Sequence, residues 1–159
     1  MKSSTSLTSN APLYTAEQRE RRNSSRWTLV QGILAPLQFL VFIVSAVLLA
    51  RYLLTGEGFE IAAASVVIKT LFLYAIMYTG ALWEHDVYGQ YLFAPAFYWE
   101  DVVSMLVIAL HSLYLGLYIS GIGSTTALIT VAIAAYVIYV INATQFLLKL
   151  RQARLSETR

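Results

Sequence analysis

The chain has 159 residues, of which 58% are hydrophobic and only 13% are charged, and its mean hydropathy is +0.62. Soluble domains are typically about one quarter charged, so this composition excludes an ordinary soluble domain. The formal net charge of +2 offers no basic surface for a nucleic acid, and no nucleic-acid partner is expected. The sequence has no cysteine, which excludes disulfides, thiolate metal sites and cysteine nucleophiles.

The N-terminal region is polar, and its two parts predict different structures. Residues 1–13 are rich in Ser and Thr, which predicts a disordered tail. In the run TAEQRERR that follows, Gln18 stands three residues after Thr15. This is the spacing of a capping box, so the run predicts a short surface helix.

Four apolar stretches come next, and each is close to the roughly 20 residues with which a helix crosses about 30 Å of hydrocarbon. They span residues 28–53, 61–83, 100–119 and 124–149. The sequence therefore predicts an all-α, polytopic membrane protein in which four transmembrane helices form a bundle within the lipid bilayer. Residues 14–155 are expected to form this single domain, and residues 156–159 a C-terminal tail.

The basic residues predict the orientation of the bundle. Of the eleven, nine lie in the two terminal regions, at Lys2, Arg19, Arg21, Arg22, Arg26, Lys149, Arg151, Arg154 and Arg159. Because cytoplasmic segments are rich in Lys and Arg, both termini are expected to be cytoplasmic. The loop between the second and third helices then lies on the same side. Trp27, Trp83 and Trp99 fall at that interface, as an aromatic belt would.

Polar side chains inside the spans recur on single helical faces. These sets are Gln31, Gln38 and Ser45 in the first helix, Lys69 and Glu84 in the second, Glu100, Ser104 and His111 in the third, and Asn142, Gln145 and Lys149 in the fourth. At 100° per residue, the third set lies within about 40° and the fourth within about 60°. Ionisable groups are costly in hydrocarbon, so each should face the interior. We expect one polar seam that leads from the cytoplasmic end into a single cavity.

The composition of the loop of residues 84–99 is the feature of the chain that a purely structural role explains least. Four acids, Glu84, Asp86, Glu100 and Asp101, flank the uncharged and strongly aromatic run VYGQYLFAPAFYW. A cytoplasmic loop without a basic residue departs from the usual charge bias. We interpret the loop as a lid over a site; the alternative is that its aromatic residues form only a membrane belt.

Structural roles are the alternative for the polar residues. The amides of Gln38, Asn142 and Gln145 fit interhelical hydrogen bonds, each worth on the order of 1 kcal/mol. Lys69 fits an ion pair with a carboxylate, or an ammonium that reaches the interface, as well as it fits a substrate contact. His111 fits either a core histidine or a functional one. Asp101 lies off the main stripe and is expected at the interface.

A carboxyl group at the rim of an apolar pocket resists ionisation and can serve as a general acid. A second carboxylate or an imidazole nearby can hold or deprotonate water. Together these groups suit the addition of water to a double bond, or the reverse elimination, rather than redox chemistry. An aromatic-lined cavity suits a large, flat, apolar substrate.

Four long runs of the chain carry a specific resemblance. They are SRWTLVQGILAPLQFLVF at 25–42, VVIKTLFLYAIMYTGALWE at 66–84, YGQYLFAPAFYWEDVVSMLVIALH at 88–111 and YVIYVINATQFLLKLRQARL at 136–155. Over about residues 12–155 the chain resembles the 3-vinyl bacteriochlorophyllide hydratase family. The resemblance implies an enzyme of bacteriochlorophyll biosynthesis in the inner, cytoplasmic or photosynthetic, membrane of a phototrophic bacterium. The implied reaction adds water to the C3 vinyl group of chlorophyllide a, or of a related bacteriochlorophyllide, to give a 1-hydroxyethyl group.

That reaction needs a proton donor, a positioned water and support for positive charge. Glu100 is the leading candidate for the donor, and Glu84 or Asp101 for the carboxylate that orients water and stabilises the cation. His111 is a candidate ligand of the substrate magnesium or a proton relay, and Lys69 a partner of the pigment propionate or of an acid. The other candidate substrate contacts are Gln38, Phe97, Trp99, Asn142 and Gln145.

The resemblance implies no cofactor and no metal of the protein's own, since the magnesium belongs to the substrate. Other pigment-biosynthesis enzymes and a second copy of the chain are candidate partners. The main alternative is a non-catalytic pigment-binding or accessory subunit of a photosynthetic membrane assembly, which would need the aromatic pocket and the histidine but not the carboxylates. A small transporter is the third alternative; it would be expected to carry an acid in the first helix, which has only amides.

Overall fold

The computed structural model describes residues 12–158, which form five α-helices and no strand. These are α1 (Ala16–Ser24), α2 (Arg26–Thr55), α3 (Phe59–Tyr88), α4 (Tyr98–Ser120) and α5 (Thr125–Glu157). Helices α2 to α5 are each long and apolar enough to cross a membrane. The predicted all-α, multi-pass membrane architecture is therefore confirmed. Most of the tail predicted to be disordered, residues 1–11, lies outside the described residues.

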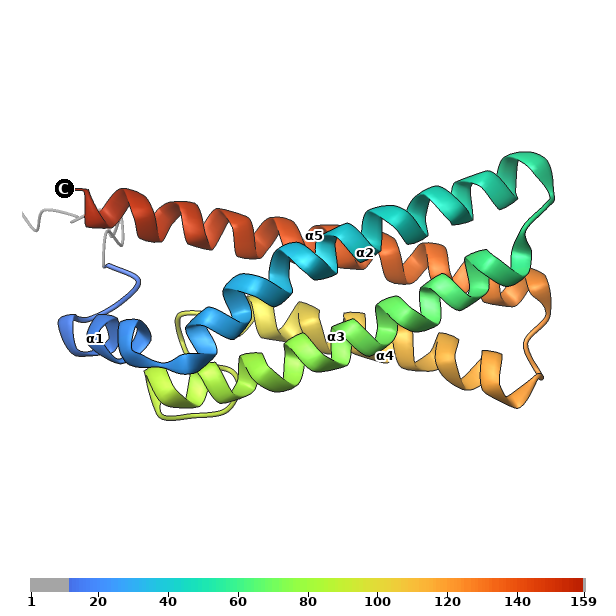
Figure 1. Ribbon diagram of the computed structural model, residues 1–159. Helices are drawn as coiled ribbons and strands as arrows, with labels where there is room; N and C mark the ends of the chain where they lie inside the picture. Colours follow the sequence, from blue (N-terminus) through green and yellow to red (C-terminus); the bar gives the residue numbers. More distant parts are fainter. Residues whose placement is uncertain (1–11, 159) are drawn as a thin grey trace, which may run out of the picture.

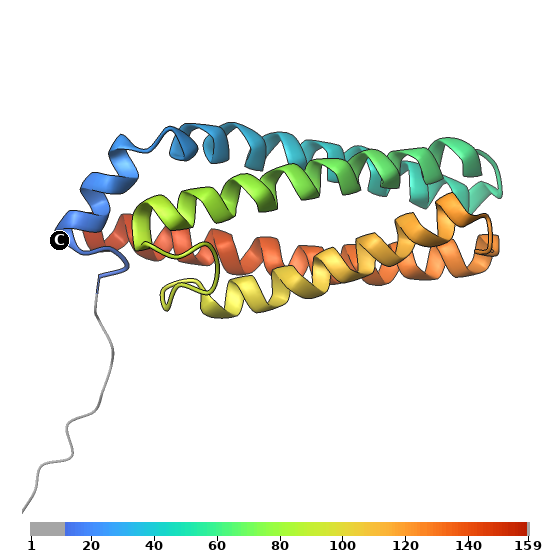
Figure 2. The same ribbon diagram turned by 90° about the horizontal axis from the view of Figure 1, so that it is seen from below.

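The four long helices form two antiparallel hairpins, α2 with α3 and α4 with α5, that face each other as two layers (Figure 2). The helices pack closely within each hairpin and approach less closely between hairpins. Helix α1 and the C-terminal end of α5 lie at the same end of the bundle (Figure 1), which we call the α1 end. An even number of spans requires this placement; the side of the membrane that it faces stays a prediction.

Long aromatic side chains fill the space between the two layers. The ring of Phe42 on α2 lies with its centroid 5.2 Å from that of Tyr136 and 4.8 Å from that of Tyr139, both on α5. Between the other two facing helices, the Tyr114 hydroxyl of α4 donates to the Ala63 carbonyl of α3 over 3.2 Å. Large apolar side chains on the outer faces, such as Leu29 and Ile33, remain exposed, as lipid contact requires.

Helix α1 begins at the capping box that the sequence predicted. The Thr15 hydroxyl accepts from the Gln18 N–H, and the Gln18 side chain accepts from the Thr15 N–H. The preceding Tyr14 is buried against the bundle, where its ring stacks on Tyr88 at 6.1 Å. Burial raises the pKa of the Tyr14 phenol, which keeps it neutral in this contact. These contacts dock α1 across the end of the bundle.

Candidate active site

The buried polar side chains gather at two levels of the bundle. At the α1 end lies a group that we call the carboxylate cluster, made of Glu84, Glu100, Asp101, Ser104, Asn142 and Lys149. Deeper between the hairpins lies a group that we call the mid-bundle cluster, made of Gln38, Lys69, His111, Tyr136 and Tyr139. The completely buried Val107 comes between Ser104 and His111 on α4. The polar residues predicted for one seam are thus buried at two levels, with an apolar residue between them on α4.

Glu84 and Asp101 come from the ends of different helices and their carboxyl groups contact each other. Each also holds the loop of residues 89–97. The Ala94 N–H donates to Glu84 Oε1, and the Phe93 N–H donates to Asp101 Oδ2 over 2.8 Å. Asp101 is only 5% exposed, so its side chain is buried in the bundle at the start of α4; its depth in the membrane stays a prediction. The hydrogen bond from the loop N–H offsets the cost of burying this carboxylate, since a buried charge needs hydrogen bonds.

Glu100 is also buried, but its carboxyl group is less satisfied. Its Oε1 lies 3.7 Å from Lys149 Nζ, and its Oε2 is buried without a hydrogen-bond partner among the described residues. Lys149 Nζ donates to the Ala96 carbonyl over 2.6 Å, so this lysine secures the loop while it faces Glu100. The arrangement leaves one carboxyl oxygen available to a bound molecule.

Asn142 joins α5 to the start of α4. Its Nδ2 donates to the Glu100 carbonyl over 2.9 Å, and its Oδ1 accepts from the Ser104 hydroxyl over 3.1 Å. Gln145 Oε1 lies 3.4 Å from Asn142 Nδ2, at the edge of this network. Asn142 therefore fixes the backbone that carries Glu100.

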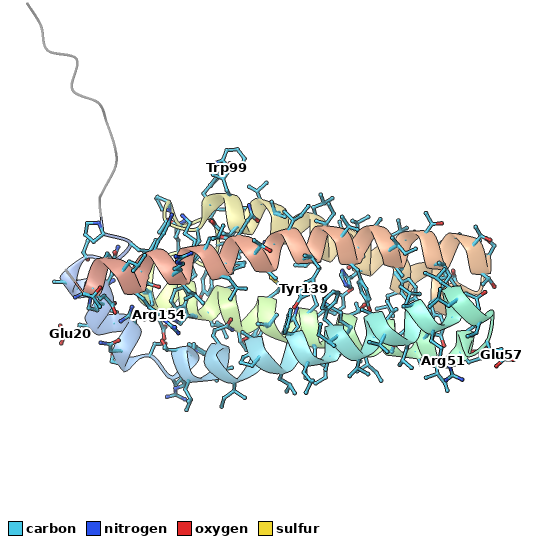
Figure 3. The ribbon with its side chains drawn as sticks, turned by 90° about the horizontal axis from the view of Figure 1, so that it is seen from above. Glu20, Arg51, Glu57, Trp99, Tyr139 and Arg154 are labelled. Carbon is cyan, nitrogen blue, oxygen red and sulfur yellow. The ribbon has the colours of Figure 1, made fainter. Side chains whose placement is uncertain are left out.

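The loop over the carboxylate cluster is well packed. Phe97 is 4% exposed, and its ring meets Trp83 edge-on at 5.7 Å and stacks on Phe146 at 6.0 Å. Phe93 has a φ of 61°, a left-handed conformation that is rare for a side chain of this size. Trp99, in contrast, is 68% exposed and points away from the bundle (Figure 3), so the fold does not bring it to the cluster.

Lys69 is completely buried in the mid-bundle cluster, and its Nζ has no hydrogen-bond partner among the described residues. Its ammonium lies 3.6 Å from the ring centroid of Tyr139, a cation–π contact. Within residues 12–158 no carboxylate lies within ion-pair distance of it, and its burial excludes a head group that reaches the interface. Placing a lysine at the centre of a bilayer costs about 2.5–3.5 kcal/mol of free energy. We therefore expect an anion from outside the chain to pair with Lys69.

His111 is completely buried, and its Nδ1 lies 2.8 Å from the Val107 carbonyl. A carbonyl can only accept, so Nδ1 carries the hydrogen and Nε2 of the neutral ring presents a lone pair. This Nε2 has no partner within the described chain, and neither has Oε1 of the buried Gln38. Three helices thus each contribute an unpartnered polar atom to the mid-bundle cluster.

Two of the cluster residues were not predicted from the sequence as site residues, namely Tyr136 and Tyr139. Both lie on α5 on the face that continues to Asn142, and this three-residue spacing is the signal that could have identified them. A groove of about 560 Å³ lies elsewhere, on the outer side of the α2–α3 hairpin. It contains none of the predicted site residues and is lined by Leu40, Val41, Val44, Leu48, Glu60, Ile61, Ala64, Ser65 and Ile68.

The fold and the two clusters define a multi-pass membrane protein with acid–base groups buried between two helical hairpins. The chain belongs to the family described as 2-vinyl bacteriochlorophyllide hydratase, whose model matches residues 14–152. Two relatives carry the same name. The protein of Rhodobacter capsulatus is 61% identical over 92% of this chain and 85% of its own length, and that of Cereibacter sphaeroides is 62% identical over 90% and 89%. No solved structure matches the chain.

Proposed function

We propose that this protein is a hydro-lyase that adds water to the vinyl group of a bacteriochlorophyllide in bacteriochlorophyll biosynthesis. The family match and the names of the two relatives support the reaction. Tetrapyrroles are numbered in two schemes, so the vinyl carbon called 3 in one is called 2 in the other. The structural observation that carries the proposal is the buried carboxylate cluster, because hydration needs an acid and a carboxylate side by side.

We assign the proton donor to Glu100. Its proton is transferred to the terminal vinyl carbon, where the electron pair of the double bond forms the new C–H bond. The positive charge then lies on the carbon attached to the ring, and the macrocycle delocalises it. The ammonium of Lys149, 3.7 Å from Glu100 Oε1, stabilises the carboxylate that Glu100 becomes.

We assign two roles to Glu84 and Asp101: they stabilise the positive charge of the cation, and they orient the water that attacks it. Two carboxyl groups in contact are stable with one proton between them, so the pair carries a single negative charge. Water adds to the cationic carbon, and the proton that it loses passes to the Glu84 and Asp101 pair and from there returns to the Glu100 carboxylate. The catalyst is thereby regenerated, and the step needs no oxidant, reductant or added cofactor.

The dimensions of the substrate restrict how it fits. Glu100 and His111 are eleven residues apart on α4, which is about 16 Å along the helix. Five bonds join magnesium to the terminal vinyl carbon, so the two lie at most about 8 Å apart. If the vinyl group reaches Glu100, the magnesium lies midway between the clusters, and the far edge of the ring reaches the mid-bundle cluster. The ring then replaces side-chain contacts between the hairpins, with Phe97 and Gln145 near the vinyl edge.

A second orientation follows from the lone pair of His111 Nε2, which suits an axial ligand of the substrate magnesium. It would place the vinyl group at mid-bundle and leave the carboxylates without a role. His111→Ala separates the two orientations. In the orientation that we propose, the variant still hydrates the vinyl pigment and the absorption bands of the bound pigment do not move. Loss of turnover together with a shift of those bands would show that His111 binds magnesium.

The test of the function is direct. Purified protein in lipid nanodiscs is incubated with vinyl chlorophyllide, and the product is expected to gain the mass of one water. Pigment that binds but never gains this mass would instead identify the accessory-subunit alternative. We place the protein in the inner membrane of a phototrophic bacterium with both termini cytoplasmic, where other pigment-biosynthesis enzymes or a second copy can contact it.

A further inference from the structure

Lys69 is the most unusual residue of the chain that the hydration chemistry does not use. Its ammonium lies between the two hairpins, near Tyr139, which Figure 3 labels in the middle of the bundle. It is fully buried and has neither a hydrogen-bond acceptor nor a carboxylate within reach in residues 12–158. Removing one member of a buried ion pair is strongly destabilising, so a buried ammonium indicates that an anion completes the site.

The neighbours of Lys69 indicate what kind of anion it takes. Oε1 of Gln38 and Nε2 of His111 are further buried polar atoms without partners in the described part of the chain. The rings of Tyr136 and Tyr139 lie beside the Lys69 ammonium, and the ring of Phe42 packs against both. The rings provide flat apolar contacts, which suit a macrocycle and not a hydrated inorganic anion. An organic carboxylate on a flat apolar body fits both features.

We infer that Lys69 binds the free propionate carboxylate of the tetrapyrrole and is the residue that distinguishes the acid from its ester. The inference rests on the proposed function, because it concerns the substrate of that reaction. A propionate on the half of the ring away from the vinyl group extends toward the mid-bundle cluster when the vinyl group is at Glu100. Lys69 Nζ and the His111 ring each lie 5.9 Å from the Tyr136 ring, so Lys69 is at the level of His111, about 16 Å from Glu100 along α4.

An ester has no negative charge, and an esterifying alcohol would bring a long chain against the buried ammonium. Comparing the acid with its ester therefore separates a contact with Lys69 from recognition of the rest of the ring.

The test compares two forms of one pigment, vinyl chlorophyllide as the free acid and as its methyl ester, by equilibrium binding to the protein in nanodiscs. Wild-type protein is expected to bind the acid about thirtyfold more tightly or better, the range for a buried ion pair. Lys69→Met should bring the ratio close to one, mainly by weakening the binding of the acid. Arg51→Met removes a positive charge from the exposed end of α2 and should leave the ratio unchanged.

Lys69→Met removes a buried charge without a large change of volume, so the fold should tolerate it; Lys69→Gln gives a second neutral variant with the same expected ratio. An acid-to-ester ratio near one in wild type, or a ratio that both variants retain, overturns the inference. Displacement of the pigment by oleate in wild type but not in Lys69→Met, with equal binding of acid and ester, also overturns it and assigns the site to a fatty acid. The binding measurement requires no turnover. The acid-to-ester ratio can therefore be interpreted even if the hydration assay fails.

Discussion

Replacing Glu100 by Gln is expected to reduce the rate of hydration by about 10²- to 10⁴-fold, the usual contribution of a general acid. Gln keeps the size of the side chain and can still face Lys149, but it cannot deliver a proton to the vinyl carbon. The hydrogen bonds from Asn142 and Ser104 go to the Glu100 backbone carbonyl, so they are retained in the variant. The measurement is the single-turnover rate with vinyl chlorophyllide, together with the affinity for the pigment.

Two observations keep this result interpretable. Glu57→Gln removes an acid from the exposed turn at the opposite end of the bundle and should hydrate the pigment at the wild-type rate (Figure 3). Pigment affinity in Glu100→Gln should remain within about threefold of wild type, because the loss concerns the transition state. A variant that turns over at the wild-type rate removes Glu100 as the proton donor.

Local patterns in the sequence were sufficient for much of the fold. The capping box of Thr15 and Gln18 depends on two residues three apart, and the four spans depend on the length of apolar runs. Helical periodicity also predicted the burial of Glu100, Ser104 and His111, because side chains on one face of a helix share an environment. Each of these predictions requires only one helix at a time.

The features that were not predicted depend on how helices are placed against one another. The contact between Glu84 and Asp101 requires the loop of residues 89–97 to bend back, with Phe93 in a left-handed conformation. The contact of Lys69 with Tyr139 depends on the rotation and register of two hairpins. The periodicity could not show that aromatic side chains of α2 and α5 pack between the hairpins, nor that the carboxylates and the mid-bundle cluster lie at different levels.

Glu84→Gln and Asp101→Asn are expected to slow hydration by about 10²- to 10³-fold, the effect of removing one preorganised electrostatic group. Both variants keep a carbonyl oxygen that can accept from the loop amides of Ala94 and Phe93, so the loop should remain in place. They differ from wild type in the charge that the pair presents to the cation. Asp86→Asn is the matched control, since Asp86 lies two residues from Glu84 but is exposed and hydrogen-bonded to Ser25.

The double variant distinguishes a shared role from two separate ones. If the two carboxyls hold one charge between them, the second substitution should add less than the first, because residues that act as a unit are not additive. Glu84→Ala provides the contrast, since it also removes the acceptor for the Ala94 N–H and should expose the loop to protease. The contrary outcome is that the conservative variants expose the loop to protease as much as Glu84→Ala does, with a loss of activity that only follows the fraction of exposed loop. That result would mean that the pair holds the loop and takes no part in the chemistry.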